Sequence, residues 1–170
     1  SSIYASTGSG KTEIFKHVIK HVLDTTESAR ILVVHPRIAL SLDQQERFKS
    51  SFKVPFSSFH SGKCLQNTTS ADEINVMNKS TRSKVKLKEL MNHDHGHIVF
   101  TSYNSLKTIA SMDWDIIVCD ESHYLTQKAF SENLDLFAAP TFFFTATPVT
   151  MLGANDMRNT DRWGKVLAEI

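Results

Sequence analysis

The segment at residues 5–12, ASTGSGKT, has the residue types that bind phosphate. It fits the pattern G-x-x-x-x-G-K-[ST], except that Ala5 stands where the first glycine is expected. Glycines let the backbone turn its N–H groups inward, which makes an anion-binding nest at the start of a helix. A lysine here reaches the β and γ phosphates of a nucleotide, and the next hydroxyl can ligate Mg²⁺. We therefore predict that ATP binds through Ser6, Thr7, Gly8, Ser9, Gly10, Lys11 and Thr12. The alternative is a flexible turn with a solvated lysine.

A pair of acidic residues, Asp120 and Glu121, directly follows the apolar run 116–119. Two adjacent carboxylates after a buried strand are costly to desolvate unless a cation or hydrogen-bond donors await them. Asp120 can hold the Mg²⁺ shared with Thr12, and Glu121 can orient an attacking water. The alternative is that Asp120 caps a helix that begins near Ser122, which would explain one acid but not the pair.

The elements that must position these groups alternate between short apolar runs and helical patterns. Apolar runs that lack polar alternation are typical of parallel strands covered on both faces. The order predicts a doubly wound α/β fold, with a mostly parallel sheet and helices on both faces. In such sheets, ligands bind beyond the carboxyl ends of the strands. The predicted strands are 3–5, 31–34, 54–59, 97–100, 116–119 and 142–144, and residues 61–92 are predicted to form one or two irregular helices with loops.

The composition indicates one ordinary globular domain. The chain has 170 residues, 41% of them hydrophobic, and a formal net charge of +1, which excludes a histone-like protein and makes any nucleic-acid contact local. No stretch is long and apolar enough for a membrane span. The cysteines Cys64 and Cys119 lack metal-ligand spacing, so we expect reduced thiols in a soluble intracellular protein, with Cys119 buried. A start at Ser1 with a strand almost at once suggests a piece of something longer.

Five stretches together resemble the superfamily-two helicases and translocases. DESH at 120–123 resembles their D-E-x-H box, and STGSGKT resembles their first motif. VVHPRIALSLDQ at 33–44, FTSYNSL at 100–106 and TATP at 145–148 are similar to three further motifs, in the family's order. These motifs span nearly the whole chain, and FTSYNSL with WDIIVCDESH favours the DNA-acting branches over the RNA helicases.

The resemblance implies that residues 1–170 are the first RecA-like, ATP-binding domain of a two-domain motor, whose second domain is absent from this chain. It assigns Lys11 and Thr12 to phosphate and Mg²⁺, Asp120 to Mg²⁺, and Glu121 to water activation. It further implies that His123, Thr145 and Thr147 couple the nucleotide state to nucleic-acid binding, and that Pro36, Arg37, Thr101 and Ser102 contact the nucleic acid. Because the second domain of the family supplies arginines, we expect this chain alone to hydrolyse ATP poorly.

Several alternatives stay open at this point. The basic run around Lys84 can be a nucleic-acid patch or, with more support, a solvated helix face. His93, His95 and His97 alternate as metal ligands can, but lack further ligands nearby. A catalytically decayed nucleic-acid-binding scaffold is a competing function. A GTPase is disfavoured, because NKST at 78–81 lacks the aspartate of its base-reading motif. The pattern gives Trp163 no role.

Overall fold

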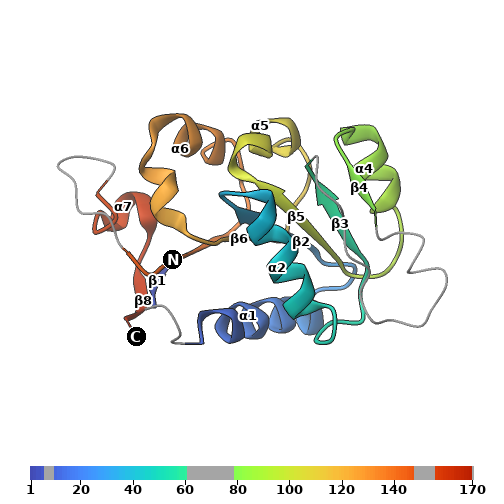
Figure 1. The fold of residues 1–170 in the computed structure, drawn as a ribbon, viewed down its shortest axis with the longest axis horizontal. Coiled ribbons are helices and arrows are strands. Elements are labelled where there is room, and N and C mark those ends of the chain that lie inside the picture. Colours follow the sequence, from blue (N-terminus) through green and yellow to red (C-terminus); the bar gives the residue numbers. More distant parts are fainter. Residues whose placement is uncertain (6–9, 61–78, 148–155, 170) are drawn as a thin grey trace.

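The computed structural model describes residues 1–5, 10–60, 79–147 and 156–169. Its centre is one 8-stranded sheet, in which every pair of neighbouring strands is parallel (Figure 1). The strand order is β4-β3-β5-β2-β6-β7-β1-β8. The strands are β1 (Ser2–Tyr4), β2 (Arg30–His35), β3 (Phe56–Phe59), β4 (Ser80–Thr81), β5 (His97–Ser102), β6 (Ile116–Cys119), β7 (Thr141–Thr145) and β8 (Val166–Glu169).

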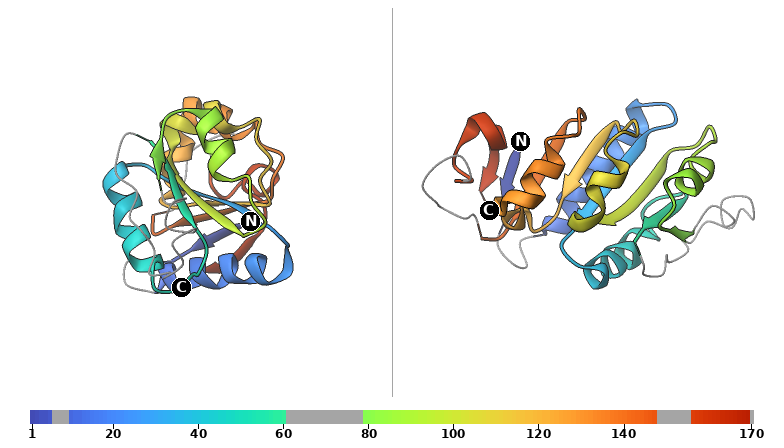
Figure 2. Two further views of the ribbon diagram at one scale, coloured as in Figure 1. Left: turned by 90° about the vertical axis from the view of Figure 1, so that its right-hand side faces the viewer. Right: turned by 90° about the horizontal axis from the view of Figure 1, so that it is seen from above.

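Helices cover both faces of this sheet, as the views from the side and from above show (Figure 2). On one face lie α1 (Lys11–Thr25) and α2 (Ile38–Phe48). The other face is covered by α4 (Lys84–Leu90), α5 (Leu106–Ile109), α6 (Lys128–Leu134) and α7 (Thr160–Trp163). Two short 3-10 helices, η1 (Tyr103–Ser105) and η2 (Ser122–Thr126), follow β5 and β6. The predicted α/β fold with helices on both faces is confirmed.

Strand β2 shows why these runs are apolar at nearly every position. Ile31 and Val33 pack into the hydrophobic cluster under α1 and α2. Leu32 and Val34 pack into the second cluster, on the opposite face. Successive side chains of a strand point to opposite faces, so a strand covered on both sides has no polar position to spare.

The strand register brings the predicted site residues to one edge of the sheet. In β2, Val34 pairs with Thr101 of β5 on one side and with Cys119 of β6 on the other. His35 pairs with Ser102, and the N–H of Asp120 donates to the carbonyl of Val34 at 2.9 Å. The segments that follow β2, β5 and β6 therefore leave the sheet side by side, at its carboxyl edge.

Most predicted strands are found with bounds shifted by one or two residues, and the larger differences are as follows. Strand β3 begins at Phe56, two residues later than predicted, because Pro55 has no N–H to give to a ladder. Within 61–92, the described residues form the short strand β4 as well as helix α4, and the rest of that segment lies outside the described residues. Strand β8 was not predicted at all, and it pairs with β1 at the edge of the sheet.

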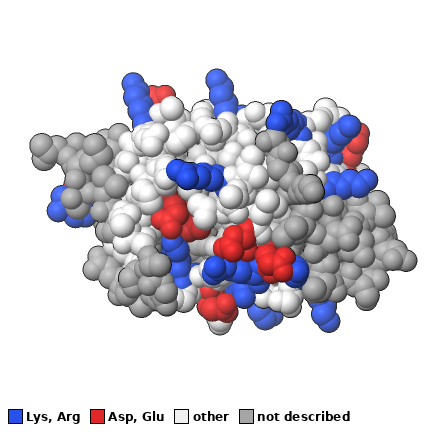
Figure 3. All heavy atoms as spheres, in the orientation of Figure 1, with Lys and Arg blue, Asp and Glu red and all other residues white. Residues whose placement is uncertain are grey.

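The charges on the face seen in Figure 3 are mixed. Acidic and basic side chains are interspersed there, in agreement with the nearly balanced net charge. Among the described residues, no helix combines the length and the apolar character that crossing a membrane requires. Cys119 is fully buried, as predicted, and burial raises the pKa of its thiol.

Candidate nucleotide-binding site

The centre of the candidate site is a lysine held between two carboxylates. Lys11, the first residue of α1, places its Nζ atom 2.9 Å from Glu121 Oε1 and 3.3 Å from Asp120 Oδ1. These residues are 110 positions apart in sequence, and the parallel sheet brings them together. Burial alone would lower the pKa of Lys11, but the charges of Asp120 and Glu121 and their hydrogen bonds raise it above its ordinary value. The lysine is therefore a fixed positive charge at the sheet edge.

Asp120 is 4% exposed and nearly every polar atom of the residue has a partner. Its Oδ1 accepts the N–H of Glu121 at 2.9 Å, and its carbonyl accepts the hydroxyl of Tyr103 at 2.6 Å. Burial would raise the pKa of the Asp120 carboxyl, but His35, Lys11 and the Glu121 N–H together hold it below the ordinary value. Asp120 is thus an ionised, oriented carboxylate at neutral pH, which is the form that binds a divalent cation.

Glu121 has a backbone conformation that its residue type avoids. Its φ and ψ are 49° and 47°, in the left-handed region. For a residue with a Cβ this costs on the order of 1 kcal/mol or more, and such strain concentrates at functional sites. This conformation turns the chain sharply after β6, at the start of η2. As a result, the side chain of Glu121 faces Lys11 and that of His123 faces the end of β7.

Only part of the predicted phosphate loop can be compared with the structure. Ser6, Thr7, Gly8 and Ser9 lie outside the described residues. Gly10 adopts a left-handed φ of 82° directly before α1, a conformation that glycine takes at no steric cost. Thr12 is half-buried in the first turn of α1, and Arg47 Nη1 lies 3.5 Å from its Oγ1.

These residues fit a nucleotide with Mg²⁺. The side chains of Thr12 and Asp120 offer oxygen ligands, which Mg²⁺ prefers, and Lys11 offers a cation for phosphate. The start of a helix of 15 residues supplies N–H groups and a partial positive charge in the same place.

The three predicted coupling residues lie together. His123 Nδ1 is 2.9 Å from Thr145 Oγ1 and 3.3 Å from Thr147 Oγ1. The same nitrogen lies 3.4 Å from Glu121 Oε2. Thr145 is fully buried at the end of β7, whereas Thr147 is exposed. A path of polar contacts therefore runs from Glu121 through His123 to the end of β7, by one contact at ion-pair distance and two hydrogen bonds.

The four predicted nucleic-acid residues are placed unevenly. Arg37 is exposed at the start of α2, and Pro36 is half-buried beside it. Ser102 is 8% exposed, with its Oγ 3.4 Å from that of Ser105. Thr101 is fully buried and donates to the carbonyl of Phe59 at 2.9 Å, because it lies within β5 rather than after it. Its hydroxyl is used inside the sheet.

A cavity of about 380 Å³ opens beside Ser102. Some of the residues that line it were not predicted from the motifs to bind a ligand. Hydroxyl, amide and guanidinium groups line it together with the ring of His60 and two apolar side chains. The polar lining residues are Arg82, Ser102, Asn104, Ser105 and Thr108. Arg82 belongs to the basic run around Lys84, and the sequence carries no signal that separates it from the lysines of α4.

The other two open alternatives can now be judged. The lysines Lys86 and Lys88 of α4 point to solvent and Leu87 is buried, so α4 presents a solvated basic face. His97 bonds His93 and Ser57 through its two ring nitrogens, at 2.8 and 2.7 Å. Within the described part of the chain, no group of three or more His, Cys, Asp or Glu residues is arranged to hold a metal ion.

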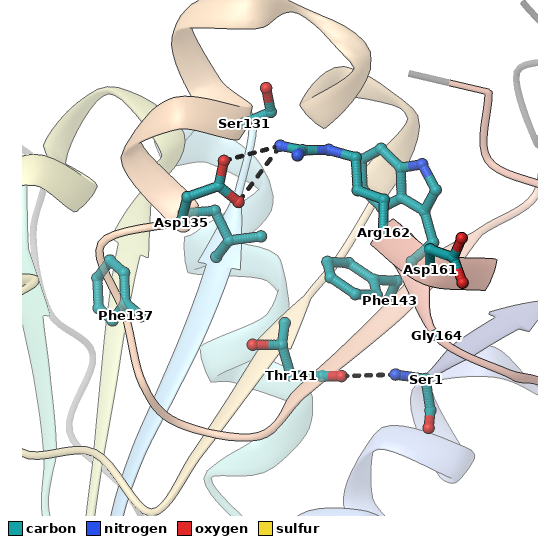
Figure 4. Close-up of a pocket in the computed structure, with 11 residues that line it drawn as sticks. Ser1, Ser131, Asp135, Phe137, Thr141, Phe143, Asp161, Arg162 and Gly164 are labelled. Carbon is teal, nitrogen blue, oxygen red and sulfur yellow. Dashed lines mark hydrogen bonds and ion pairs between the residues drawn. The ribbon is translucent and has the colours of Figure 1, made fainter. Parts of the chain in front are cut away.

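A second cavity of about 380 Å³ lies away from the candidate site, between α6, β7 and α7 (Figure 4). Arg162 spans it and contacts both carboxylate oxygens of Asp135, at 3.1 and 3.3 Å. Trp163 is 2% exposed and packs edge-on against Phe143, so its role is to anchor α7 to the sheet. None of the predicted site residues lines this cavity.

Comparison with protein families identifies one match. The model of the family described as "Type III restriction enzyme, res subunit" matches residues 2–150, which include every predicted site residue. Among curated proteins, the replication restart protein PriA of Helicobacter pylori strain J99 is 32% identical over 129 residues. This alignment covers 76% of the chain but 18% of PriA, so the chain spans about a fifth of the length of this relative.

Solved structures show the same fold. The type ISP restriction-modification enzyme LlaGI, solved as a nuclease-deletion mutant with a DNA substrate mimic, gives a TM-score of 0.75 at 18% identity. The comparison covers 100% of this chain and 18% of LlaGI. The Hef helicase domain of Pyrococcus furiosus gives a TM-score of 0.69 at 18% identity, over 99% of this chain and 34% of Hef. The chain thus shares its fold with the matching parts of these two structures.

Proposed function

Because the chain belongs to the family of the type III restriction enzyme res subunit, we propose that it is the ATP-binding motor domain of a DNA helicase or translocase. One observation carries the proposal. The lysine of the phosphate-binding pattern lies within 3.3 Å of both acidic residues of the D-E-x-H pattern, at the carboxyl edge of a parallel sheet. A decayed nucleotide site would have no reason to keep these three groups together.

Each residue has a proposed role in ATP hydrolysis. Residues 6–10 and Lys11 hold the phosphates, while Thr12 and Asp120 hold Mg²⁺, which neutralises charge on the phosphates when bound. Glu121 orients a water and accepts its proton. Lys11 contacts both carboxylates, so a phosphate group would compete with Asp120 and Glu121 for the lysine. His123, Thr145 and Thr147 pass changes at Glu121 to the end of β7.

The nucleic-acid surface is proposed to lie beside this site, at the ends of β2, β3 and β5. Pro36, Arg37 and Ser102 start it, and the cavity with Arg82, Asn104 and Ser105 extends it. Because Thr101 is buried, we assign it a supporting place under Ser102 rather than a direct contact through its hydroxyl. Hydroxyl and guanidinium groups suit phosphate contacts, which position a strand without reading its sequence. Binding should therefore weaken as salt rises.

DNA is the proposed track. LlaGI was solved with a DNA substrate mimic, and PriA is a replication restart protein. The FTSYNSL segment, which resembles a motif of the DNA-acting branches, forms the end of β5, η1 and the first residue of α5. Ser102, Asn104 and Ser105 of this segment line the cavity. An RNA helicase of the same superfamily is the second candidate. Since ATP and nucleic acid are intracellular, we place the activity inside a cell.

A second RecA-like domain is the proposed partner. Across the cleft it would supply arginines that stabilise the transferring phosphoryl group, a contribution of ~10³ to 10⁵ in rate. The 170-residue chain alone should then bind ATP weakly and hydrolyse it poorly. Robust nucleic-acid-stimulated turnover by these residues alone would contradict this part of the proposal.

The test is phosphate release from ATP by the longest natural chain that contains these residues, with and without single-stranded DNA, duplex DNA and RNA. Lys11→Ala is the control. Stimulation by DNA that disappears in the control variant supports the proposal. Stimulation by RNA alone would support the second candidate, an RNA helicase. No turnover under any condition, by a chain that includes both motor domains, would favour the nucleic-acid-binding scaffold.

A further inference from the structure

His35 is a buried histidine that neither the motifs nor the proposed roles assign. It is the last residue of β2 and is fully buried. Neither of its ring nitrogens has a hydrogen-bond partner among the described residues. Burying a polar group without a partner costs free energy, typically about 1–3 kcal/mol. A side chain kept in this state calls for an explanation.

The geometry around Asp120 explains why His35 is buried without a hydrogen-bond partner. His35 Nδ1 lies 3.5 Å from Asp120 Oδ2, which is an ion-pair distance and slightly beyond a good hydrogen bond. The other carboxylate oxygen, Oδ1, is held by the N–H of Glu121 and faces Lys11. The main chain of Asp120 is held by Val34 and by Tyr103. Among the residues that the structure describes, His35 is the group that contacts Oδ2.

The ring itself is held in place by its surroundings. Its plane lies nearly parallel to that of Phe100, with 9° between the planes and 6.3 Å between the centroids. The backbone of His35 pairs with Ser102 in β5. Because the ring is also fully buried, it has little room to move, and it can set the orientation of the carboxylate.

From this arrangement we infer that His35 is a positioning residue for the cation-binding carboxylate. The Nδ1 edge of the ring lies 3.5 Å from Asp120 Oδ2, and this polar contact keeps the carboxylate plane turned so that Oδ1 faces Lys11 Nζ. Lys11 is the group that a phosphate would attract away. His35 and the Glu121 N–H then remain as the groups that orient Asp120. This inference rests on the proposed function, since it concerns how Asp120 holds Mg²⁺.

The inference also explains a difference between the polar residues at this edge. Ser102 follows the same register as His35 but is satisfied near Ser105, at 3.4 Å. His35 points to the carboxylate and has no alternative partner among the described residues. Partners that orient a metal ligand from behind typically change metal affinity about 10–100-fold when they are removed.

The experiment measures how much Mg²⁺ strengthens nucleotide binding. The affinity of a fluorescent ADP analogue is determined with and without Mg²⁺, and the ratio of the two is compared between variants. His35→Leu keeps the approximate volume and removes the polar contact, so the ratio should fall about tenfold while the Mg²⁺-free affinity stays within about twofold. His35→Asn puts a carboxamide N–H near the position of Nδ1 and should restore the ratio to within about threefold of the parent.

Two further variants separate positioning from a structural effect. His35→Gln is as polar as His35→Asn but carries its amide too far along the chain, so it should behave like His35→Leu. It also keeps the inference testable if His35→Leu does not fold. His97→Leu removes another fully buried histidine, at the opposite end of the neighbouring strand, and should lower the unfolding midpoint without changing the Mg²⁺ ratio.

The outcomes distinguish failure of the positioning role of His35 from failure of the proposed nucleotide site. Equal Mg²⁺ ratios in the parent and His35→Leu, or equal loss in His35→Asn and His35→Gln, would overturn the positioning role while leaving the nucleotide site standing. A parent protein that binds the analogue with no gain from Mg²⁺ would overturn both the proposed cation site and this inference.

Discussion

The two edges of the central sheet treat their buried polar groups in opposite ways. At the amino edge, the guanidinium of Arg30 donates to the carbonyls of four residues of the surrounding loops, at 2.6–2.7 Å. His97 bonds at both ring nitrogens. At the carboxyl edge, both ring nitrogens of His35 lack hydrogen-bond partners among the described residues, and Glu121 is held in a left-handed conformation.

This difference separates stability from function within one sheet. A polar group that is fully satisfied by protein atoms has nothing left to offer a ligand, so the amino edge stabilises the fold. Buried groups without a hydrogen-bond partner and strained backbone cost stability, and they persist where function requires them. Variants at the two edges should therefore fail in different assays, and each prediction below tests that separation.

The largest effect is expected for Glu121→Gln. The substitution keeps the size of the side chain and removes the base, so nucleic-acid-stimulated ATP hydrolysis by the longest natural chain should fall by about 10²–10³. Nucleotide affinity should change by less than about fivefold, and the unfolding midpoint should hold or rise. Steady-state phosphate release and nucleotide titration measure these quantities. An unchanged kcat would show that Glu121 takes no part in hydrolysis, and the carboxyl edge would then not be the functional edge of the sheet.

Arg30→Met should have the reverse pattern. It removes the donors to the carbonyls of Ser28, Met91, His93 and His95, and the free energy of unfolding should drop by about 2–4 kcal/mol. Urea denaturation measures the loss. Under conditions where the variant is folded, its affinity for nucleotide should match that of the parent. A folded variant that no longer binds nucleotide would show that the amino edge is not independent of the site.

A smaller effect concerns acid. Burial, and to a lesser extent the charge of His35, lower the pKa of His60 to about 4, and burial lowers the pKa of His97 in the same direction. Below about pH 6.5 the unfolded chain therefore takes up protons that the folded chain does not, and stability falls as the pH drops from about 6.5 toward 4. The lowered pKa of Asp120 acts only below that window, since its stabilisation is lost as the pH falls through its folded pKa.

His60→Asn tests the share of the carboxyl edge in this acid sensitivity. The variant should lose about 1–2 kcal/mol less stability than the parent between pH 7 and pH 4.5. Urea denaturation series at both pH values measure it. The same loss in both proteins would assign the acid sensitivity to the amino edge, where His97 lies.

Much of the site could be predicted because its signal is local. The role of Lys11 can be predicted from the glycines that precede it. Asp120 and Glu121 can be predicted because a pair of acidic residues directly follows an apolar strand. His35 carries the same kind of signal, a polar residue directly after the run ILVV, and the same rule could have found it. The family resemblance assigns a role to the next two residues, Pro36 and Arg37, and none to His35.

Other features could not be read from the sequence. The clamp around Arg30 depends on the path of residues 91–95, which no periodicity encodes. The left-handed backbone of Glu121 contradicts its local preference and exists only because the sheet and η2 over-determine it. Strand β8 pairs with β1 across more than 160 positions of the sequence. A short edge strand of this kind has too short an apolar run to be predicted from the sequence.

The smallest effect is expected for Arg82→Ala, which sharpens the comparison within the carboxyl side itself. Arg82 and Lys86 are both exposed, but Arg82 lines the cavity beside Ser102 and Lys86, four residues later on α4, does not. Both carry one positive charge, so a general electrostatic attraction would treat them alike. A direct phosphate contact would not.

We expect Arg82→Ala to weaken single-stranded DNA binding about three- to fivefold and to reduce the slope of log K against log salt by about 0.7. Lys86→Ala should change both quantities by less than half as much. Fluorescence anisotropy at four salt concentrations measures them. Equal effects of the two variants would place the strand outside the cavity and leave Arg82 as one more charge of the solvated face. A loss confined to Arg82 would mean that the edge which holds unsatisfied groups for the nucleotide also holds them for the nucleic acid, so that one edge of the sheet serves both ligands.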